Sequence, residues 1–225
     1  MTPKDYQQFG LYAKDKGISS LNLNYYNQRV ENSLTPYILE ERTLNVTVMD
    51  VFSRLMMERI IWVAGGVDDH MSTIVQAQLM FLDSIDSNDI TMHIDSPGGS
   101  VKSGLSMVDV MDYIKSDIRT INTGMAASMG SVLLGAGTKG KRGSLRFSQT
   151  MLHNSSGGAV GNIQDARISM KEWEKVNNIL FTLLGGYCGK SAEQVENDAS
   201  RDLWLDAEQA LSYGIIDEIV GKKKK

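Results

Sequence analysis

Ser128 lies in a stretch of small and apolar residues, GMAASMGSVLLGAGTKG, which runs from Gly124 to Gly140. A serine in such surroundings either fills space at the start of a helix or acts as a nucleophile. Small neighbours would let a substrate carbonyl approach the main chain closely. The stretch differs from the G-x-S-x-G turn of α/β-hydrolases, because Ala126 occupies the first glycine position. Taken alone it favours a structural serine, so a catalytic role depends on what the rest of the chain supplies.

Two glycine-rich turns each follow a strand-like segment. The first is Ser96-Pro97-Gly98-Gly99, and the second runs from residue 124 to residue 130. A strand that turns directly into a helix leaves backbone N–H groups without intrahelical partners at the helix start. Such donors suit the anionic oxygen that develops in the transition state of acyl transfer.

A serine nucleophile needs a general base, and the chain contains three histidines. His153 ends the strand-like SQTMLH and precedes the loop sequence NSSGG, a position from which a side chain can face a cleft. His70 reads as a polar residue at a helix start, and His93 lies on the polar face of a strand. The pattern therefore favours His153 as the base and structural or surface roles for the other two.

A carboxylate that orients the histidine would complete the set. The candidates lie in the C-terminal part of the chain and are Asp198, Asp202, Asp206 and Asp217. Asp206 reads as the cap of a following helix. The residue pattern leaves the choice between Asp198 and Asp202 open.

The elements that must position these residues alternate between strands and helices. Strand patterns cover residues 60–65, 89–95, 118–124 and 148–153. Helical patterns cover residues 50–60, with Asp50 as N-cap, and then 68–86, 104–116 and a long segment within 162–189. The glycine pair at 185 and 186 is expected to end that long helix. Strand, turn and helix repeat in this order, which predicts an α/β domain.

Length and composition fit a single globular domain with an appended arm. The chain has 225 residues and a formal net charge of −4, so nucleic acid is not an expected partner. Residues 1–33 are polar and read as an extension or a removable pro-segment, and residues 221–225 form a basic tail. A single cysteine excludes an internal disulfide and suits a reducing compartment. Without a membrane-length apolar run or a secretory leader, the expected location is the cytoplasm.

The chain resembles the proteolytic subunit family of the Clp (caseinolytic) protease. The segments SPGGSVKSG, GMAASMGSVLLGAGTKGKR, MLHNSSGG and RDLWLDAEQALSYGIID look like family signatures and occur in the family's order, between Leu34 and Val220. The resemblance implies an α/β fold built as a crotonase-like spiral of ββα units over residues 34–220. It also implies a protruding handle helix around residues 162–184 that interdigitates two heptameric rings.

The resemblance also implies the roles of the site residues. Ser128 would attack the scissile carbonyl, His153 would take and return the proton, and Asp202 would orient His153. The backbone N–H groups of Gly99 and Met129 would bind the oxyanion. Neither a metal nor a cofactor is implied.

The implied function is that of an ATP-independent serine endopeptidase subunit, which degrades unfolded polypeptides delivered by a hexameric AAA+ unfoldase. The chain has no GxxxxGK[ST] motif, so the ATPase must be a separate protein. One alternative is a catalytically silent paralogue that fills positions in a mixed ring. Another is an acyl-CoA-handling crotonase relative, for which CoA binding would be the discriminating observation.

Some residues depart from the family pattern. Asn154 and Ser155 follow the histidine where the family usually has Gln-Pro, and the loss of proline is expected to leave this loop less constrained. Ser200 stands where many members carry an acid that takes part in ring stacking. Thr91 and His93 replace tyrosines that line the unfoldase-docking cleft. We therefore expect ring stacking and partner docking to differ in detail.

Overall fold

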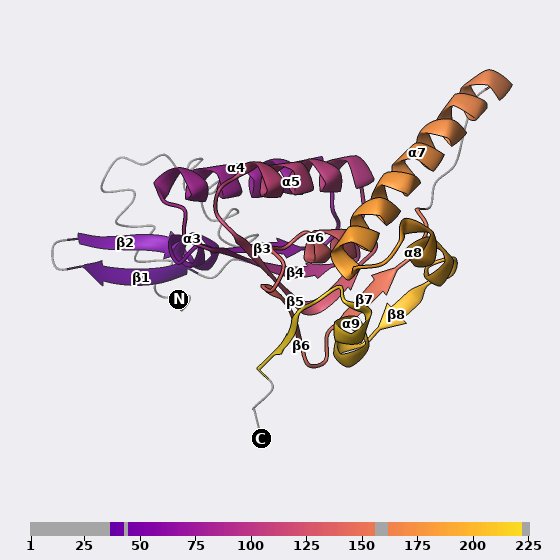
Figure 1. The fold of residues 1–225 in the computed structure, drawn as a ribbon. Helices are drawn as coiled ribbons and strands as arrows, with labels where there is room; N and C mark the ends of the chain where they lie inside the picture. Colours follow the sequence, from indigo (N-terminus) through magenta and orange to yellow (C-terminus); the bar gives the residue numbers. More distant parts are fainter. Residues whose placement is uncertain (1–36, 43–44, 156–161, 222–225) are drawn as a thin grey trace, which may run out of the picture. The chain divides into compact units, whose positions relative to one another are not determined.

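A computed structural model describes residues 37–42, 45–155 and 162–221 of the chain (Figure 1). The expected extension over residues 1–33 lies outside these ranges, as do residues 222–225 of the basic tail. The chain divides into two compact units, residues 1–54 and residues 55–225.

In the first unit the described residues form a β-hairpin. Strands β1 (Tyr37–Arg42) and β2 (Asn45–Asp50) pair antiparallel, with Tyr37 opposite Asp50 and Arg42 opposite Asn45. Helix α3 (Val51–Met57) follows directly. The carboxylate of Asp50 accepts a hydrogen bond of 3.0 Å from the Ser53 N–H, which confirms the expected N-cap.

The second unit is built on a seven-stranded, mainly parallel sheet. Five strands lie in the order β3 (Ile60–Ala64), β4 (Ile90–Ser96), β5 (Ile118–Ala127), β6 (Arg142–Leu145) and β9 (Glu218–Val220), all parallel. The second half of β5 pairs instead with β7 (Gln149–Leu152), which pairs antiparallel with β8 (Leu203–Leu205). The expected α/β class is confirmed.

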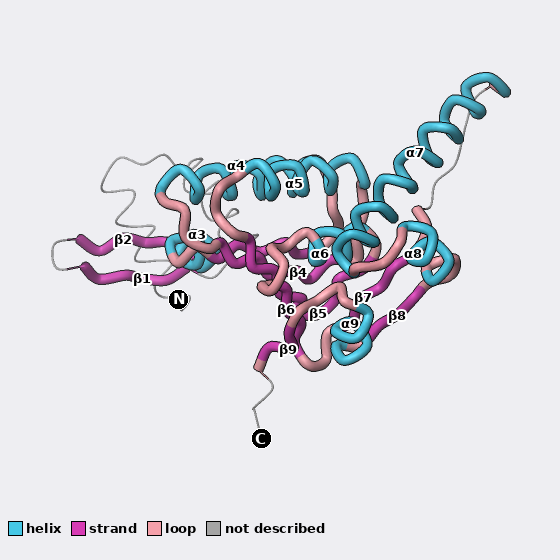
Figure 2. Tube along the Cα trace, in the orientation of Figure 1, coloured by secondary structure: helices cyan, strands magenta, loops and turns pink. Residues whose placement is uncertain are grey.

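Helices α4 (Asp69–Ile85) and α5 (Val101–Tyr113) lie side by side along one face of the sheet (Figures 1 and 2). In α4, Val75, Leu79 and Leu82 are buried at helical spacing, which explains why this face packs inward. The remaining helices of the unit are α6 (Met129–Gly135), α7 (Ile163–Cys188), α8 (Ala192–Asp198) and α9 (Ala207–Tyr213). Asp206 caps α9 through a capping box, as expected. In the described ranges no helix combines the length and apolarity needed to cross a membrane.

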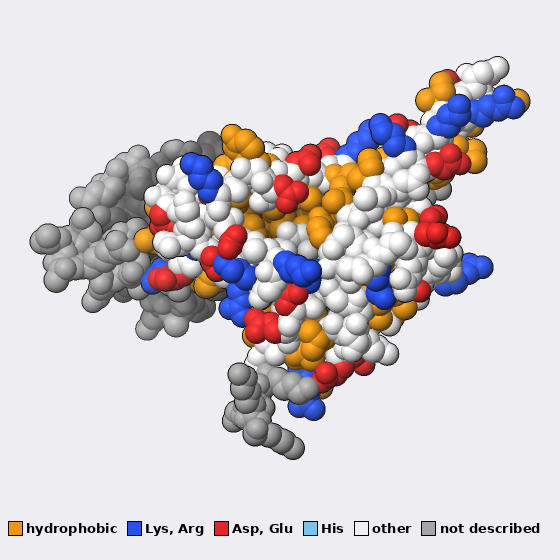
Figure 3. Space-filling model, viewed as in Figure 1, with side chains coloured by type: hydrophobic (Ala, Val, Ile, Leu, Met, Phe, Trp, Pro, Cys, Tyr) orange, Lys and Arg blue, Asp and Glu red, His pale blue; other side chains and the backbone are white. Residues whose placement is uncertain are grey.

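Helix α7 projects away from the sheet (Figure 1), and its outer part carries both charged and apolar side chains (Figure 3). Ile163, Ile168 and Met170 are all exposed there. The expected end of this helix at the glycine pair is wrong, because α7 continues through Gly185 to Cys188. The helix ends at Gly189, which adopts the left-handed conformation (φ 68°) and donates its N–H to the Gly185 carbonyl.

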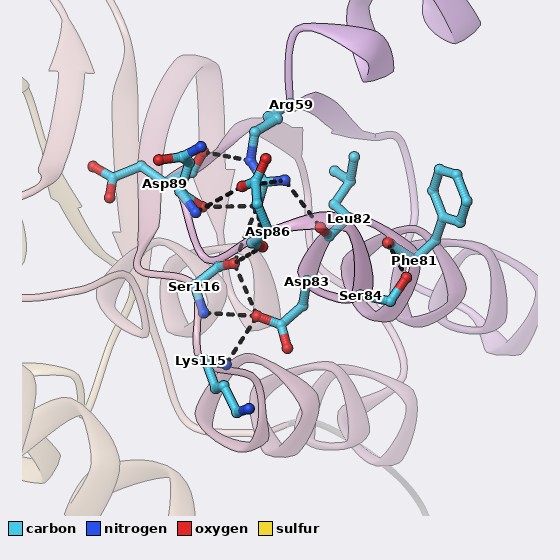
Figure 4. A network of polar contacts seen from close by, with 10 residues as sticks. Arg59, Phe81, Leu82, Asp83, Ser84, Asp86, Asp89, Lys115 and Ser116 are labelled. Carbon is cyan, nitrogen blue, oxygen red and sulfur yellow. Dashed lines mark hydrogen bonds and ion pairs between the residues drawn. The ribbon is translucent and has the colours of Figure 1, made fainter.

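An arginine network ties the start of β3 to the ends of α4 and α5 (Figure 4). The guanidinium of Arg59 donates to the carbonyls of Leu82 (2.9 Å) and Asn88 (2.7 Å) and to the Ser116 hydroxyl (3.0 Å). On the other side, the Asp83 carboxylate accepts hydrogen bonds from the Ser116 N–H and hydroxyl. Arg59 thereby adds a donor to the last turn of α4, where the Leu82 carbonyl also accepts a long bond of 3.5 Å from the Asp86 N–H, and a second donor to the following loop.

A buried ion pair joins β6 to the segment before β9. The Arg142 guanidinium lies 2.6 Å from one Asp217 oxygen, and the two side chains are 3% and 18% exposed. Burial alone would raise the pKa of Asp217, but hydrogen bonds from Arg142 and its positive charge outweigh burial, so the pKa lies below its ordinary value.

Candidate active site

Ser128 occupies the turn between β5 and α6 in a strained backbone conformation. Its φ of 55° and ψ of −123° fall in a region that non-glycine residues rarely adopt. The Ser128 N–H donates to the Met151 carbonyl at 2.9 Å, which ties the turn to β7. Ser128 is the N-cap residue of α6, yet its side chain makes no capping hydrogen bond. The hydroxyl is therefore available for a hydrogen bond to a group outside α6.

Gly98 makes this turn possible by its lack of a side chain. With φ of 90°, it approaches so closely that a Cβ atom would lie 2.6 Å from the Ser128 Cβ and 2.8 Å from the Met129 nitrogen. Glycine alone tolerates both the conformation and the contact. The two glycine-rich turns expected from the sequence thus meet at the serine.

His153 follows β7, and the register of the sheet brings it to Ser128. Ala127, the last residue of β5, pairs with Met151 of β7. Because the two strands are parallel, Ser128 and His153, which follow their ends, lie at the same edge of the sheet. The His153 Nε2 lies 2.8 Å from the Ser128 Oγ, within hydrogen-bonding distance. The imidazole is 25% exposed.

Asp202 precedes β8, which pairs antiparallel with β7 so that Leu203 lies opposite Leu152. His153 and Asp202 are the residues just beyond that pair, and therefore lie opposite each other. The Asp202 Oδ1 is 3.6 Å from the His153 Nδ1, and the Asp202 side chain is 61% exposed. This is an ion-pair distance rather than a hydrogen bond. Asp198 instead accepts a hydrogen bond of 3.0 Å from the Tyr213 hydroxyl.

A pocket of about 70 Å³ opens beside Ser128 and His153. Gly99 and Met129, the two expected oxyanion donors, both line it. Apolar side chains form much of its wall, and those from α7 are Leu180, Phe181 and Leu184. Sequence reasoning did not locate this pocket. The sequence signal that could have indicated it is the spacing of apolar residues near the end of the long helix, but the same spacing is equally typical of residues packed in the core.

The other two histidines lie elsewhere, as expected. The His93 ring stacks on Trp62 with ring centroids 4.8 Å apart, on strands β4 and β3. Burial, and secondarily the charge of Arg119, lowers the pKa of His93, so the ring stays neutral at physiological pH. His70 is exposed in the first turn of α4. Neither residue lines the pocket.

The fold and this site together define an α/β protein with a serine, a histidine and an aspartate gathered at the ends of adjoining strands. The family model described as Clp protease matches residues 43–223. The chain therefore belongs to the Clp protease family.

Similar curated proteins are named ATP-dependent Clp protease proteolytic subunit. That of Porphyromonas gingivalis is 47% identical over 220 residues, covering 97% of this chain and 99% of the relative. That of Bacteroides fragilis is 48% identical over 217 residues, covering 96% and 99%. That of Bacteroides thetaiotaomicron is 46% identical over 217 residues with the same coverage.

Proposed function

We propose that the chain is the proteolytic subunit of a Clp-type protease, an ATP-independent serine endopeptidase. It cleaves unfolded polypeptides that a separate AAA+ unfoldase delivers. The observation that carries this proposal is the 2.8 Å contact between the Ser128 Oγ and the His153 Nε2. Membership of the Clp protease family and the names of the relatives support the same conclusion. A silent ring subunit would have no need of this contact.

The geometry supports a two-stage acyl transfer. As the Ser128 Oγ forms a bond to the scissile carbonyl carbon, His153 accepts the hydroxyl proton at Nε2. The C–N bond then breaks, and His153 gives that proton to the departing amine. In the second stage His153 deprotonates a water molecule, whose oxygen forms a bond to the acyl carbon. The bond between that carbon and the Ser128 Oγ then breaks, the peptide leaves with a new carboxyl terminus, and His153 returns the proton to Ser128.

Asp202 and two backbone groups assist these steps in the proposal. Asp202 lies on the Nδ1 side of His153 and would stabilise the imidazolium that forms when the proton is taken. The Gly99 and Met129 N–H groups would bind the oxyanion, since both residues line the pocket that contains Ser128. The apolar wall of the pocket suits an apolar side chain of the substrate next to the scissile bond.

We further propose a domain layout and an assembly, for which the family membership is the support. We assign residues 34–220 to the peptidase domain, residues 1–33 to an extension and residues 221–225 to a basic tail. Two stacked heptameric rings in the cytoplasm would enclose the active sites, with α7 as the contact between rings. The exposed apolar residues of α7, Ile163, Ile168 and Met170, support a contact of this kind. The strand face that carries Thr91 and His93 would receive the hexameric unfoldase.

A fluorophosphonate probe tests the proposed nucleophile directly, because it forms a covalent bond only with an activated serine. We expect one label per chain, mapped by mass spectrometry to Ser128, and no label after heat denaturation or in Ser128→Ala. Labelling elsewhere, or none in the folded protein, would contradict the proposal. Native mass spectrometry of the same sample measures the ring size.

A further inference from the structure

The loop that carries His153 is attached to helix α7 by hydrogen bonds outside the triad. Ser155 donates its N–H (3.2 Å) and its hydroxyl (3.1 Å) to the Oδ1 of Asn177. The Nδ2 of Asn177 in turn donates to the Oδ1 of Asn154 at 3.0 Å. Both ends of the Asn177 amide are thus used, on the two residues that directly follow His153.

The contacts of Asn177 begin just after the last residue of β7 that is paired in the sheet. The ladder between β7 and β8 ends at the pair of Leu152 and Leu203, one residue before His153. On its other side His153 is followed by the two residues that Asn177 holds. The backbone of His153 therefore lies between the ladder and the Asn177 contacts, and both limit how far the imidazole can move.

Asn154 extends this attachment toward the segment that leads to Asp202. Its Nδ2 lies 3.5 Å from the carbonyl oxygen of Ala199, a long contact at the limit of hydrogen bonding. Asn177 therefore orients an amide that lies between the loops of His153 and Asp202. Ser155 also supplies an N–H that a proline at this position would lack, so the absence of proline does not leave the loop without restraint.

We propose that Asn177 is a positioning residue for the His153 general base. It touches neither substrate nor the reacting atoms, and it acts by fixing Asn154 and Ser155. The inference rests on the proposed peptidase function. Misplacement of a catalytic group by about 1 Å can lower a rate by about 10²-fold, so a hydrogen-bonded tether of this kind affects catalysis well beyond its effect on stability.

The test compares Asn177→Ala with Asn178→Ala, which changes the next residue of the same helix in the same way. Asn178 is exposed, and it makes its hydrogen bond to Thr182 through the backbone carbonyl, which the substitution keeps. Hydrolysis of a short fluorogenic peptide gives kcat and KM for each variant. We expect kcat of Asn177→Ala to fall by about 10- to 100-fold with KM nearly unchanged, because positioning acts on the transition state. Asn178→Ala should match the wild type.

Two further variants separate positioning from folding. Asn177→Asp keeps the acceptor for both Ser155 donors and should recover most of the kcat that Asn177→Ala loses. Asn177→Leu removes all three hydrogen bonds while filling the space, and should reproduce the Asn177→Ala loss with a melting temperature close to that of the wild type. If Asn177→Ala does not fold, the kcat of Asn177→Leu tests the positioning role instead.

Several outcomes would overturn the proposal. One is a kcat for Asn177→Ala equal to that of Asn178→Ala, and another is failure of both the alanine and the leucine variants to fold. No recovery in Asn177→Asp would also contradict it. An inactive wild-type protein is a different result, because it would overturn the proposed peptidase function rather than the role of Asn177 alone.

Discussion

The Nε2 of His153 lies 2.8 Å from the Oγ of Ser128, although the two residues are 25 positions apart in the chain. The parallel pairing of β5 with β7 produces this contact, because Ala127 is in register with Met151. A slip of one residue would turn His153 to the opposite face of the sheet. The contact between the Ser128 hydroxyl and the His153 ring therefore depends directly on strand register.

Asp202→Asn should lower kcat by about 10²-fold or more, since an amide cannot stabilise the imidazolium as a carboxylate does. The matched control is Asp198→Asn, because Asp198 accepts a hydrogen bond from Tyr213 rather than facing His153. Peptide hydrolysis by both variants shows which aspartate orients His153, a choice between Asp198 and Asp202 that the sequence pattern left open. Equal activity in the two variants would show that Asp202 has no special role.

Gly98→Ala should abolish peptide hydrolysis, because the added Cβ would lie 2.6 Å from the Ser128 Cβ and the residue has φ of 90°. Gly186→Ala is the control, since a Cβ at Gly186 meets nothing within 4 Å. Gly186 lies in the last turn of α7, where alanine has the higher helix propensity, so this change should not lower stability and should add at most about 1 kcal/mol. Activity of Gly98→Ala close to that of Gly186→Ala would contradict the close approach of the two turns.

Arg59→Ala should lower the free energy of unfolding by about 2–3 kcal/mol, because it leaves several carbonyls of the α4 end without their charged donor. Arg119→Ala removes an exposed ion pair with Glu218 and should cost no more than about 1 kcal/mol. Denaturant unfolding of both variants measures the difference. Similar losses would mean that the network in Figure 4 does not stabilise the fold.

Asp217→Asn should cost about 3 kcal/mol at neutral pH, because the substitution leaves the Arg142 charge buried without its partner. The pKa of Asp217 is lower in the folded state than in the unfolded state. Its contribution is therefore complete above the unfolded-state pKa of about 3.9 and is lost as the pH falls through the lower folded-state value.

The difference in unfolding free energy between wild type and Asp217→Asn should accordingly shrink as the pH is lowered below about 4. Denaturant titrations at neutral pH and at about pH 3 measure it. A difference that stays constant with pH would show that the carboxylate does not titrate as described.

Much of the fold was predictable where one local signal decided the outcome. Alternation predicted a strand over residues 89–95, which the structure places at residues 90–96, and apolar residues at helical spacing predicted the helix over residues 68–86 that contains α4. Asp206 was predicted as a cap from the helical pattern of the sequence that follows it, and the structure places it at the start of α9. The predicted end of the long helix at Gly185 and Gly186 was wrong, because the residue that caps α7 is Gly189, which adopts the left-handed conformation.

The residues of the candidate site could be proposed from the sequence, but their surroundings could not. Local pattern raised Ser128 and His153 as candidates but left Ser128 more in keeping with a structural role, and the family resemblance supplied its role as nucleophile and the choice of Asp202. The pocket wall from α7 and the amide of Asn177 escaped prediction, because each depends on how a distant helix packs against the His153 loop. The spacing of residues along one segment does not indicate how α7 packs against the His153 loop.

The most direct test of the account is hydrolysis of a short fluorogenic peptide by the purified protein, with Ser128→Ala as the comparison. The account predicts measurable cleavage by the wild type without an ATPase. It also predicts a loss of about 10⁴-fold or more in the variant, as when a triad nucleophile is removed. Cleavage by Ser128→Ala at the wild-type rate, or no cleavage by the folded wild-type protein, would contradict it.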